Sequence, residues 1–328
     1  SSRRRHTRYP LVTGVQTCAL PISVAASGTL TRRRAADMIG AMPDLPIVDS
    51  HVHLWDPSLH EVPWLHGNDR LNHVFGLPEY DAATAGLHVE AMVYLEIDIA
   101  APYKLIEAQH VSRLADTDPR LQGIVASAPL EYGAQAREFL KALVAVDPKR
   151  IKGVRRLIQG ESDPRFCVAD RFVEGVRLLP EFGLSFDLCI YHPQMASAIE
   201  LVRRCPETSF ILDHIGKPGI KAGLLDPWRA QIDELASLPN VTCKVSGVTT
   251  EADLDHWTID DLAPYVHHVL AAFGEDRVVY GGDWPVVLLG AEYRRWVEAL
   301  DALTTHLSPA ARAKLWAGNA KRFYRLEG

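Results

Sequence analysis

Residues 185–218, SFDLCIYHPQMASAIELVRRCPETSFILDHIGKP, contain one complete unit of the repeating pattern from which the fold can be predicted. An apolar run at 185–190 and a second apolar run at 209–212 are each short enough to be a buried strand. The residues between them that have the spacing of an amphipathic helix are Ile199, Leu201 and Val202. A strand, a helix and a second strand in this order predict a parallel β-α-β unit.

The same alternation continues through the chain from Ile47 onward. The short apolar or β-branched runs that we interpret as strands are 47–49, 92–96, 123–126, 151–155, 185–190, 209–212, 241–245 and 278–280. Eight strands alternating with helices predict an α/β fold, a single-domain (β/α)8 TIM barrel over residues 47–326. A doubly wound sheet is the main alternative, but no G-x-G-x-x-G or G-x-x-x-x-G-K sequence follows an early strand.

Charge and composition exclude several classes of partner. The formal net charge is −6, and residues 1–34 hold seven arginines and no acid, so the remainder carries 28 − 41 = −13. A body this acidic argues against nucleic acid as a partner. No stretch approaches the roughly 20 apolar residues of a membrane span. Five scattered cysteines indicate neither disulfides nor a cysteine zinc site, so we expect a cytoplasmic protein. The sequence leaves open whether the chain forms homo-oligomers.

The segment between the first strand and the first helix is unusually long. Residues Pro57 to Pro78, with Trp64 and His66 and with Trp55 just before them, show no periodicity. Long irregular connections in compact domains are commonly functional. We therefore interpret this insert as lid-like.

Polar side chains gather where the strands end, which is the face of a barrel that carries the active site. His51 and His53 follow the first strand at alternate positions, so both imidazoles can point toward the barrel axis. Together with Asp283 after the last strand they predict a shared site. Arg155 ends the fourth strand, and is either a substrate contact or a salt bridge at the rim.

Two further histidines occupy strand ends. His214 follows the sixth strand beside Asp213, where it is either a catalytic or substrate contact or a core hydrogen-bonding residue. His192 precedes Pro193 in a turn after the fifth strand, where anchoring of the loop and a ligand role both remain open.

These motifs together resemble the amidohydrolase superfamily. They are His51-x-His53, Gly-Val-Arg155, Tyr-His192-Pro-Gln194, Asp213-His214-Ile-Gly-Lys217-Pro218, Lys244-Val-Ser246-Gly247, Gly-Gly-Asp283-Trp284-Pro285 and Gly-Asn319-Ala-Lys-Arg-Phe-Tyr. More narrowly, the chain is similar to the branch of metal-dependent hydrolases that includes sugar-lactone hydrolases of the L-fuconolactonase and L-rhamnonolactonase type. Related branches contain pyrone-dicarboxylate lactonases and decarboxylases of muconate-type acids.

The resemblance implies a metal or water site at His51, His53 and Asp283. No bridging carboxylate or lysine is evident at the fourth strand, where Arg155 points inward, so a binuclear centre is not expected. One divalent ion, Zn²⁺ or Mn²⁺, suits these nitrogen and oxygen ligands. Some lactonases of the superfamily work without metal, so metal-independent catalysis is the alternative.

The reaction implied by the resemblance is hydrolysis of a sugar (aldono-) lactone or a related lactone. Asp283 is expected to be the general base, with His214 as its catalytic partner. The residues expected to bind the substrate are Arg155, His192, Lys217, Trp284 and Trp55. The alternatives are a metal-dependent decarboxylase of a muconate-type or aromatic acid and, more remotely, a non-catalytic ligand-binding barrel.

The first 34 residues are expected to be a non-native or disordered extension, because residues 1–22 lack periodicity and resemble translated sequencing-adapter text. A chain that begins at Ala35 should therefore keep the far-ultraviolet circular dichroism and the thermal midpoint of the full chain. Failure of that shortened chain to fold would show instead that the extension is part of the protein.

Overall fold

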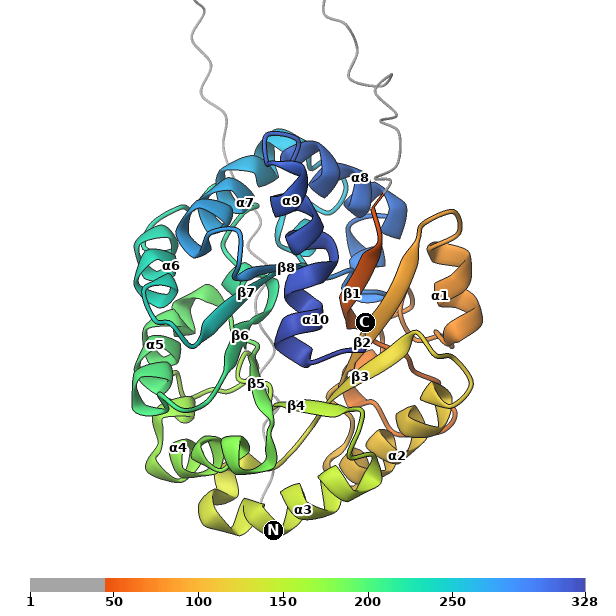
Figure 1. Cartoon of the computed structure of the whole chain (residues 1–328), viewed down its shortest axis with the longest axis vertical. Helices are drawn as coiled ribbons and strands as arrows, with labels where there is room; N and C mark the ends of the chain where they lie inside the picture. Colours follow the sequence, from red (N-terminus) through yellow and green to blue (C-terminus); the bar gives the residue numbers. More distant parts are fainter. Residues whose placement is uncertain (1–44, 328) are drawn as a thin grey trace, which may run out of the picture. The chain divides into compact units, whose positions relative to one another are not determined.

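The computed structural model describes residues 45–327, and the extension at residues 1–34 lies outside them. Eight parallel strands are hydrogen-bonded in sequence order, which confirms the predicted (β/α)8 barrel (Figure 1). The strands are β1 (Ile47–Val52), β2 (Val89–Leu95), β3 (Leu121–Ala126), β4 (Ile151–Arg155), β5 (Ser185–Leu188), β6 (Phe210–Leu212), β7 (Val241–Val245) and β8 (Val278–Tyr280). Nearly all of their residues are buried, as expected for a parallel sheet covered on both faces.

Helices surround the ring of strands (Figure 1). They are α1 (Leu77–Ala83), α2 (Lys104–Ala115), α3 (Ala136–Val146), α4 (Asp170–Arg177), α5 (Met195–Arg204), α6 (Trp228–Ala236), α7 (Ile259–Phe273), α8 (Tyr293–Leu303), α9 (Pro309–Ala313) and α10 (Asn319–Tyr324). Each long helix buries one face; α5, for example, buries Ile199, Leu201 and Val202 in the main hydrophobic core. Within residues 45–327, none of these helices combines the length and apolar character that crossing a bilayer requires.

The barrel closes between β1 and the residues that follow β8. Val52 and Trp284 form a parallel bridge. On either side of it, the Asp283 amide donates to the His51 carbonyl at 2.8 Å and the His53 amide donates to the Trp284 carbonyl at 2.8 Å. The two ends of the sequence that carry the predicted site are therefore hydrogen-bonded to each other.

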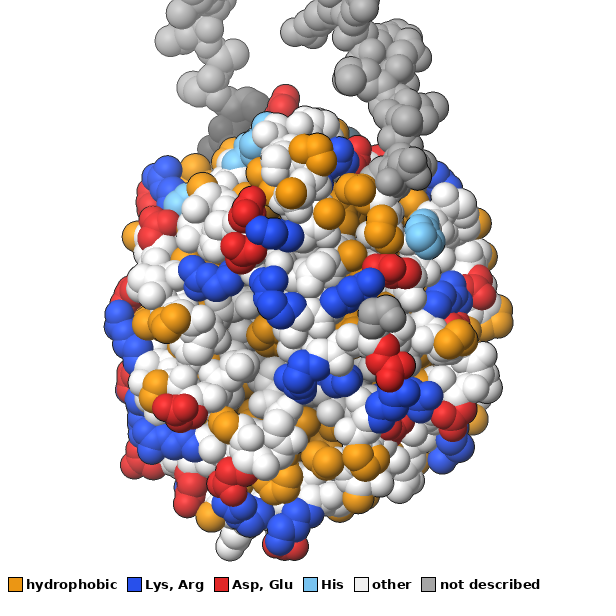
Figure 2. Space-filling view, in the orientation of Figure 1, with side chains coloured by type: hydrophobic (Ala, Val, Ile, Leu, Met, Phe, Trp, Pro, Cys, Tyr) orange, Lys and Arg blue, Asp and Glu red, His pale blue; other side chains and the backbone are white. Residues whose placement is uncertain are grey.

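The interior of the barrel is a separate apolar cluster closed at one end by α10. Side chains of the strands, including Val48, Val93 and Ile211, pack there with Ala320 and Tyr324 of α10. In Figure 1 this helix lies across the centre of the ring. Figure 2 shows the same face, where Lys and Arg side chains are interspersed with Asp and Glu.

The insert after β1 is held to its surroundings by backbone hydrogen bonds. Trp55 and Phe75 form an antiparallel bridge with two bonds of 2.9 Å at its base. The Ala100 amide donates to the Glu61 carbonyl at 3.0 Å, which ties the insert to the connection between β2 and α2. That the insert opens and closes as a lid stays a prediction.

One buried carboxyl group links α2 to β2. Glu107 accepts hydrogen bonds through Oε1 from the Tyr94 hydroxyl at 2.8 Å and from the Ile97 amide at 2.9 Å, while its Oε2 is buried without a partner. Burial, reinforced by the charge of Glu96, raises the pKa of Glu107 from 4.5 to about 8. Between those two values the unfolded chain releases a proton that the folded chain retains. Ionisation of this group therefore lowers the free energy of unfolding as pH rises.

We expect Glu107→Gln to reduce the loss of folding stability with rising pH, because glutamine keeps the Oε1 acceptor and cannot ionise. The free energy of unfolding of the wild type should fall by at most about 1.4 kcal/mol per pH unit from this group between pH 5.5 and 7.5. Urea denaturation should show the variant gaining stability relative to the wild type as pH rises. Glu207→Gln, at an exposed position, is the control. A stability difference between Glu107→Gln and the wild type that does not change with pH would contradict the raised pKa of Glu107.

Candidate active site

Asp49 connects the two ends of the chain that form the site. Its Oδ1 accepts hydrogen bonds from the amides of Gly282 at 2.7 Å and His51 at 3.1 Å. Its Oδ2 accepts from the hydroxyls of Tyr293 at 2.7 Å and Tyr80 at 3.0 Å. A Cβ at Gly282 would lie 2.4 Å from Asp49 Oδ2, so this approach requires glycine. Burial raises the pKa of Asp49, and these four hydrogen bonds partly oppose the shift.

His51, His53 and Asp283 meet at one point. The two Nε2 atoms are 3.2 Å apart, and Asp283 Oδ1 lies 3.6 Å from His51 Nε2 and 3.7 Å from His53 Nε2. Asp283 has a left-handed backbone with φ of 56°, a strained conformation for a residue other than glycine. The hydrogen bond from its amide to His51 fixes this conformation.

These three atoms suit one divalent ion. Ligands 2.0–2.2 Å from one ion are separated by roughly 2.8–3.8 Å at bond angles of about 90–120°. His53 Nδ1 must donate to the Leu95 carbonyl at 2.8 Å, since a carbonyl only accepts, and the neutral ring then has its lone pair on Nε2. Arg155 Nη1 lies 3.3 Å from His51 Nε2, so an ion there would share its surroundings with a guanidinium. His51, His214 and Asp283 also offer ligand atoms within 4.8 Å of one another.

His214 lies against the other carboxylate oxygen. Its Nδ1 is 2.9 Å from Ser246 Oγ and 3.9 Å from Asp283 Oδ2. A Cβ at Gly247 would lie 2.4 Å from His214 Nδ1 and 3.1 Å from Asp283 Oδ2, so glycine permits this packing. Burial, and then the neighbouring His51, lowers the pKa of His214 well below its usual value, and the ring is neutral near pH 7.

Arg155 is charge-balanced. Its Nε donates to Glu96 Oε1 at 2.7 Å, and both side chains are at most 5% exposed. Its Nη1 lies 3.5 Å from Asp213 Oδ2. Arg155 therefore forms the predicted salt bridge with a buried carboxylate and lines the cavity, while its contact with a substrate stays a prediction.

A buried ammonium lies beneath the histidines. Lys244 Nζ is 2.8 Å from Asp213 Oδ1, 2.9 Å from Asp187 Oδ2 and 3.3 Å from His51 Nδ1, and it is fully buried. Burial acts to raise the pKa of Asp213, but Lys244, His214 and Arg155 together outweigh it and lower that pKa to about 2. Burial raises the pKa of Asp187 to about 6 although Lys244 opposes the shift. The Tyr324 hydroxyl of α10 donates to Asp187 at 2.7 Å, so the network spans the barrel interior.

A cavity of about 220 Å³ opens beside this cluster. The predicted site residues that line it are His53, Arg155, His214, Lys217 and Asp283. The other lining residues are Trp64, Ile97, Asp98, Leu157, Gln159, Cys189 and Val286. Five predicted site residues line this cavity, and His51 contacts His53, Arg155 and Asp283 among them, so the fold brings six of the predicted residues together.

Three predicted substrate contacts are not on this lining. His192 Nδ1 donates to the Lys217 carbonyl at 3.0 Å, which is the anchoring role left open by the sequence. Trp284 is 1% exposed and packs edge-on against Phe75 and Tyr80 beneath the site. Trp55 is 5% exposed, and its indole Nε1 donates to the His73 carbonyl of the insert at 3.0 Å. All three support neighbouring residues instead of forming the wall.

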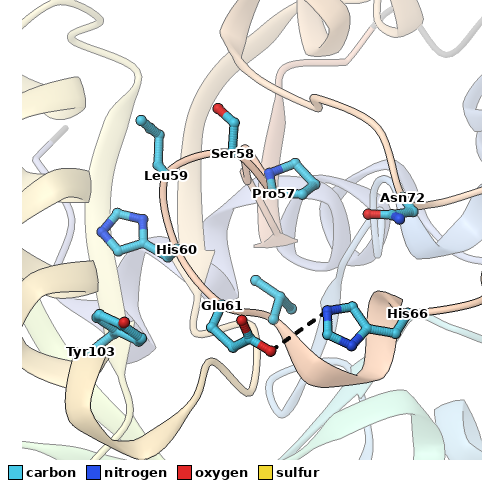
Figure 3. A pocket seen from close by; sticks show the side chains of 9 residues that line it. Pro57, Ser58, Leu59, His60, Glu61, His66, Asn72 and Tyr103 are labelled. Atoms are coloured by element: carbon cyan, nitrogen blue, oxygen red, sulfur yellow. Dashed lines mark ion pairs between the residues drawn. The ribbon is translucent and has the colours of Figure 1, made fainter.

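A larger cavity of about 540 Å³ lies on the insert itself (Figure 3). Figure 3 shows Glu61 and His66 turned toward each other there, with 3.6 Å between His66 Nε2 and Glu61 Oε1. Both side chains are more than half exposed, and no predicted catalytic residue lines this cavity. It is an open surface depression, and the smaller cavity is the candidate site.

Comparison with known proteins gives consistent matches. The family model described as Amidohydrolase matches residues 48–326. A protein of Burkholderia multivorans named L-fucono-1,5-lactonase is 31% identical over 299 residues, which cover 85% of this chain and 96% of that protein. A Scheffersomyces stipitis protein named L-rhamnono-gamma-lactonase is 25% identical, and the match covers 87% of this chain and 100% of that protein.

A solved structure also matches. A crystal structure of an amidohydrolase from Burkholderia multivorans with bound zinc has a TM-score of 0.78 and 27% sequence identity. The match covers 86% of this chain and 99% of that one.

Proposed function

The chain belongs to the amidohydrolase family, and from that premise we propose that it is a hydrolase that opens a sugar lactone. The relatives named as lactonases support this substrate class. The observation that carries the proposal is the meeting of two imidazoles and one carboxylate, from opposite ends of the sequence, beside a cavity of about 220 Å³. Hydrolysis of an ester needs an activated water and a stabilised oxyanion, and both can be supplied here.

One divalent ion, Zn²⁺ or Mn²⁺, is proposed at His51, His53 and Asp283. The spacing of their donor atoms supports this assignment. The zinc present in a relative's crystal structure is consistent with it. Such an ion, when bound, lowers the pKa of water and polarises a carbonyl group.

Asp283 is the proposed general base. Its side chain is 5% exposed, and among the described residues its ion-pair contacts are three imidazoles and no lysine or arginine. As water attacks the lactone carbonyl, the carboxylate takes one proton from it. When the tetrahedral intermediate collapses, the ring C–O bond breaks and this proton passes to the leaving oxygen, which yields a hydroxy acid.

Lys217 is proposed to receive the developing charge, and His214 is proposed to orient the substrate. Lys217 Nζ donates to Gln159 Oε1 at 2.7 Å and forms no ion pair with any residue in 45–327. An ammonium has three donors, so Lys217 can also donate to an oxyanion or to the product carboxylate. The neutral His214 ring, fixed by Ser246, is proposed to orient the substrate against Asp283.

Replacement of the base tests the proposal. Asp283→Asn should lower kcat for an aldonolactone by about 10²–10⁴-fold, because the amide cannot accept the proton. A pH indicator follows the reaction, since lactone hydrolysis releases acid whereas decarboxylation consumes a proton. Circular dichroism of the variant should match the wild type, and the exposed Asp255→Asn should keep full activity.

Retention of most activity by Asp283→Asn would remove Asp283 from the mechanism. A wild type that makes the indicator more basic with an aromatic or muconate-type acid, and opens no lactone, would favour the decarboxylase alternative.

A further inference from the structure

The insert after β1 fixes one aromatic side chain at the candidate cavity. Trp64 lines the cavity, and its Nε1 donates to the Ile97 carbonyl at 2.6 Å. Its ring packs edge-on against Trp55, with 5.4 Å between the ring centroids. Trp64 is nevertheless 37% exposed. An apolar ring surface is therefore held in place without being covered by protein.

A carboxylate lines the same cavity. Asp98, the residue after the carbonyl that holds Trp64, also lines the cavity. Its left-handed backbone, with φ of 52°, is fixed by a hydrogen bond from its amide to Glu96 Oε2 at 2.8 Å. Within residues 45–327 no ion pair includes Asp98, so its oxygens are available to accept hydrogen bonds from a ligand.

The remaining charges of the cavity fit one anionic group. Glu96 already balances Arg155, with 2.7 Å between Arg155 Nε and Glu96 Oε1. Lys217 is the lining cation without a carboxylate partner in the described chain. Ring opening creates one carboxylate, which this ammonium can pair with. A second carboxylate on the substrate would have no free cation and would be repelled by Asp98.

The size of the cavity favours a single ring. At about 220 Å³ it lies below the 300–1,000 Å³ typical of sites for drug-sized ligands. A monosaccharide ring has a C–H face that packs on an aromatic ring and hydroxyl groups that donate to a carboxylate. An indole and a carboxylate that line the same cavity match these two features.

We propose, on the basis of the lactone hydrolysis proposed above, that Trp64 and Asp98 determine specificity for an uncharged, polyhydroxylated monosaccharide lactone. Trp64 packs against the C–H face of the sugar ring, and Asp98 accepts hydrogen bonds from its hydroxyl groups. Asp98 also rejects lactones that carry an additional carboxylate.

Two matched substrates test the role of Asp98. One is an aldonolactone, and the other is the lactone of the corresponding aldaric acid, which has a carboxylate in place of the terminal CH₂OH. The wild type should prefer the aldonolactone in kcat/KM. Asp98→Asn should raise KM for the aldonolactone about 10-fold with kcat changed less than about 3-fold, and should shift the preference toward the aldarolactone by about 10-fold.

Trp64 is tested with the aldonolactone. Trp64→Ala should raise KM about 10-fold, and Trp64→Phe should recover most of that loss, because a smaller aromatic face remains. The controls are Leu59→Ala and Asp69→Asn, exposed positions on the same insert that lie off the cavity. Both controls should keep wild-type kinetics.

A wild type that prefers the aldarolactone, an unchanged preference in Asp98→Asn, or an unchanged KM in Trp64→Ala would overturn the proposal. Calorimetric binding of the open-chain aldonate and aldarate repeats the comparison without turnover. If no lactone is opened but the wild type binds aldonate selectively and both variants lose that selectivity, only the lactonase function is contradicted.

Discussion

The closure of the barrel by the buried Asp49 carboxylate is the constraint on which the site depends. Four donors from β1, the turn after β8, α1 and α8 bind its two oxygens, at 2.7–3.1 Å. An unpaired carboxylate would be costly to bury, so these four groups are held together or the barrel does not close. Closure then brings Asp283 against His51 through backbone hydrogen bonds and places it in a left-handed conformation. The positions of His51, His53 and Asp283 are therefore a consequence of how the first and last strands meet.

Charge compensation is the second condition for this site. Lys244, Arg155 and their carboxylate partners are all buried, and isolated charges in such surroundings would be strongly destabilising. Lys244 forms ion pairs with Asp187 and Asp213, and Arg155 forms an ion pair with Glu96. The charges of these two cations are therefore already balanced. Among the described residues, Lys217 has the neutral Gln159 as its hydrogen-bond partner and the Tyr191 ring at 5.2 Å, and no carboxylate forms an ion pair with it. The same cavity is lined by the cation Lys217, by the carboxylate of Asp98 and by the indole of Trp64.

The sequence predicts the barrel well because each strand is a short apolar run buried on both faces, and the eight runs match the eight strands of the structure. It also predicts the meeting of His51, His53 and Asp283, since all carboxyl ends of barrel strands share one rim. It does not predict which tryptophan lines the cavity. The insert has no periodicity, and the choice of Trp64 over Trp55 depends on a bond to the distant Ile97 carbonyl. The sequence shows Lys244 inside an apolar strand, but its two partners come from β5 and from the residue that follows β6, and they become apparent only in the fold.

A crystal structure of the protein grown with Zn²⁺ tests the central geometry most directly, with anomalous diffraction locating any bound zinc. The closure described above predicts a single ion or ordered solvent molecule in contact with His51 Nε2, His53 Nε2 and Asp283 together. Side chains so far apart that no one atom touches all three, or a zinc ion bound by other residues in their place, would contradict it.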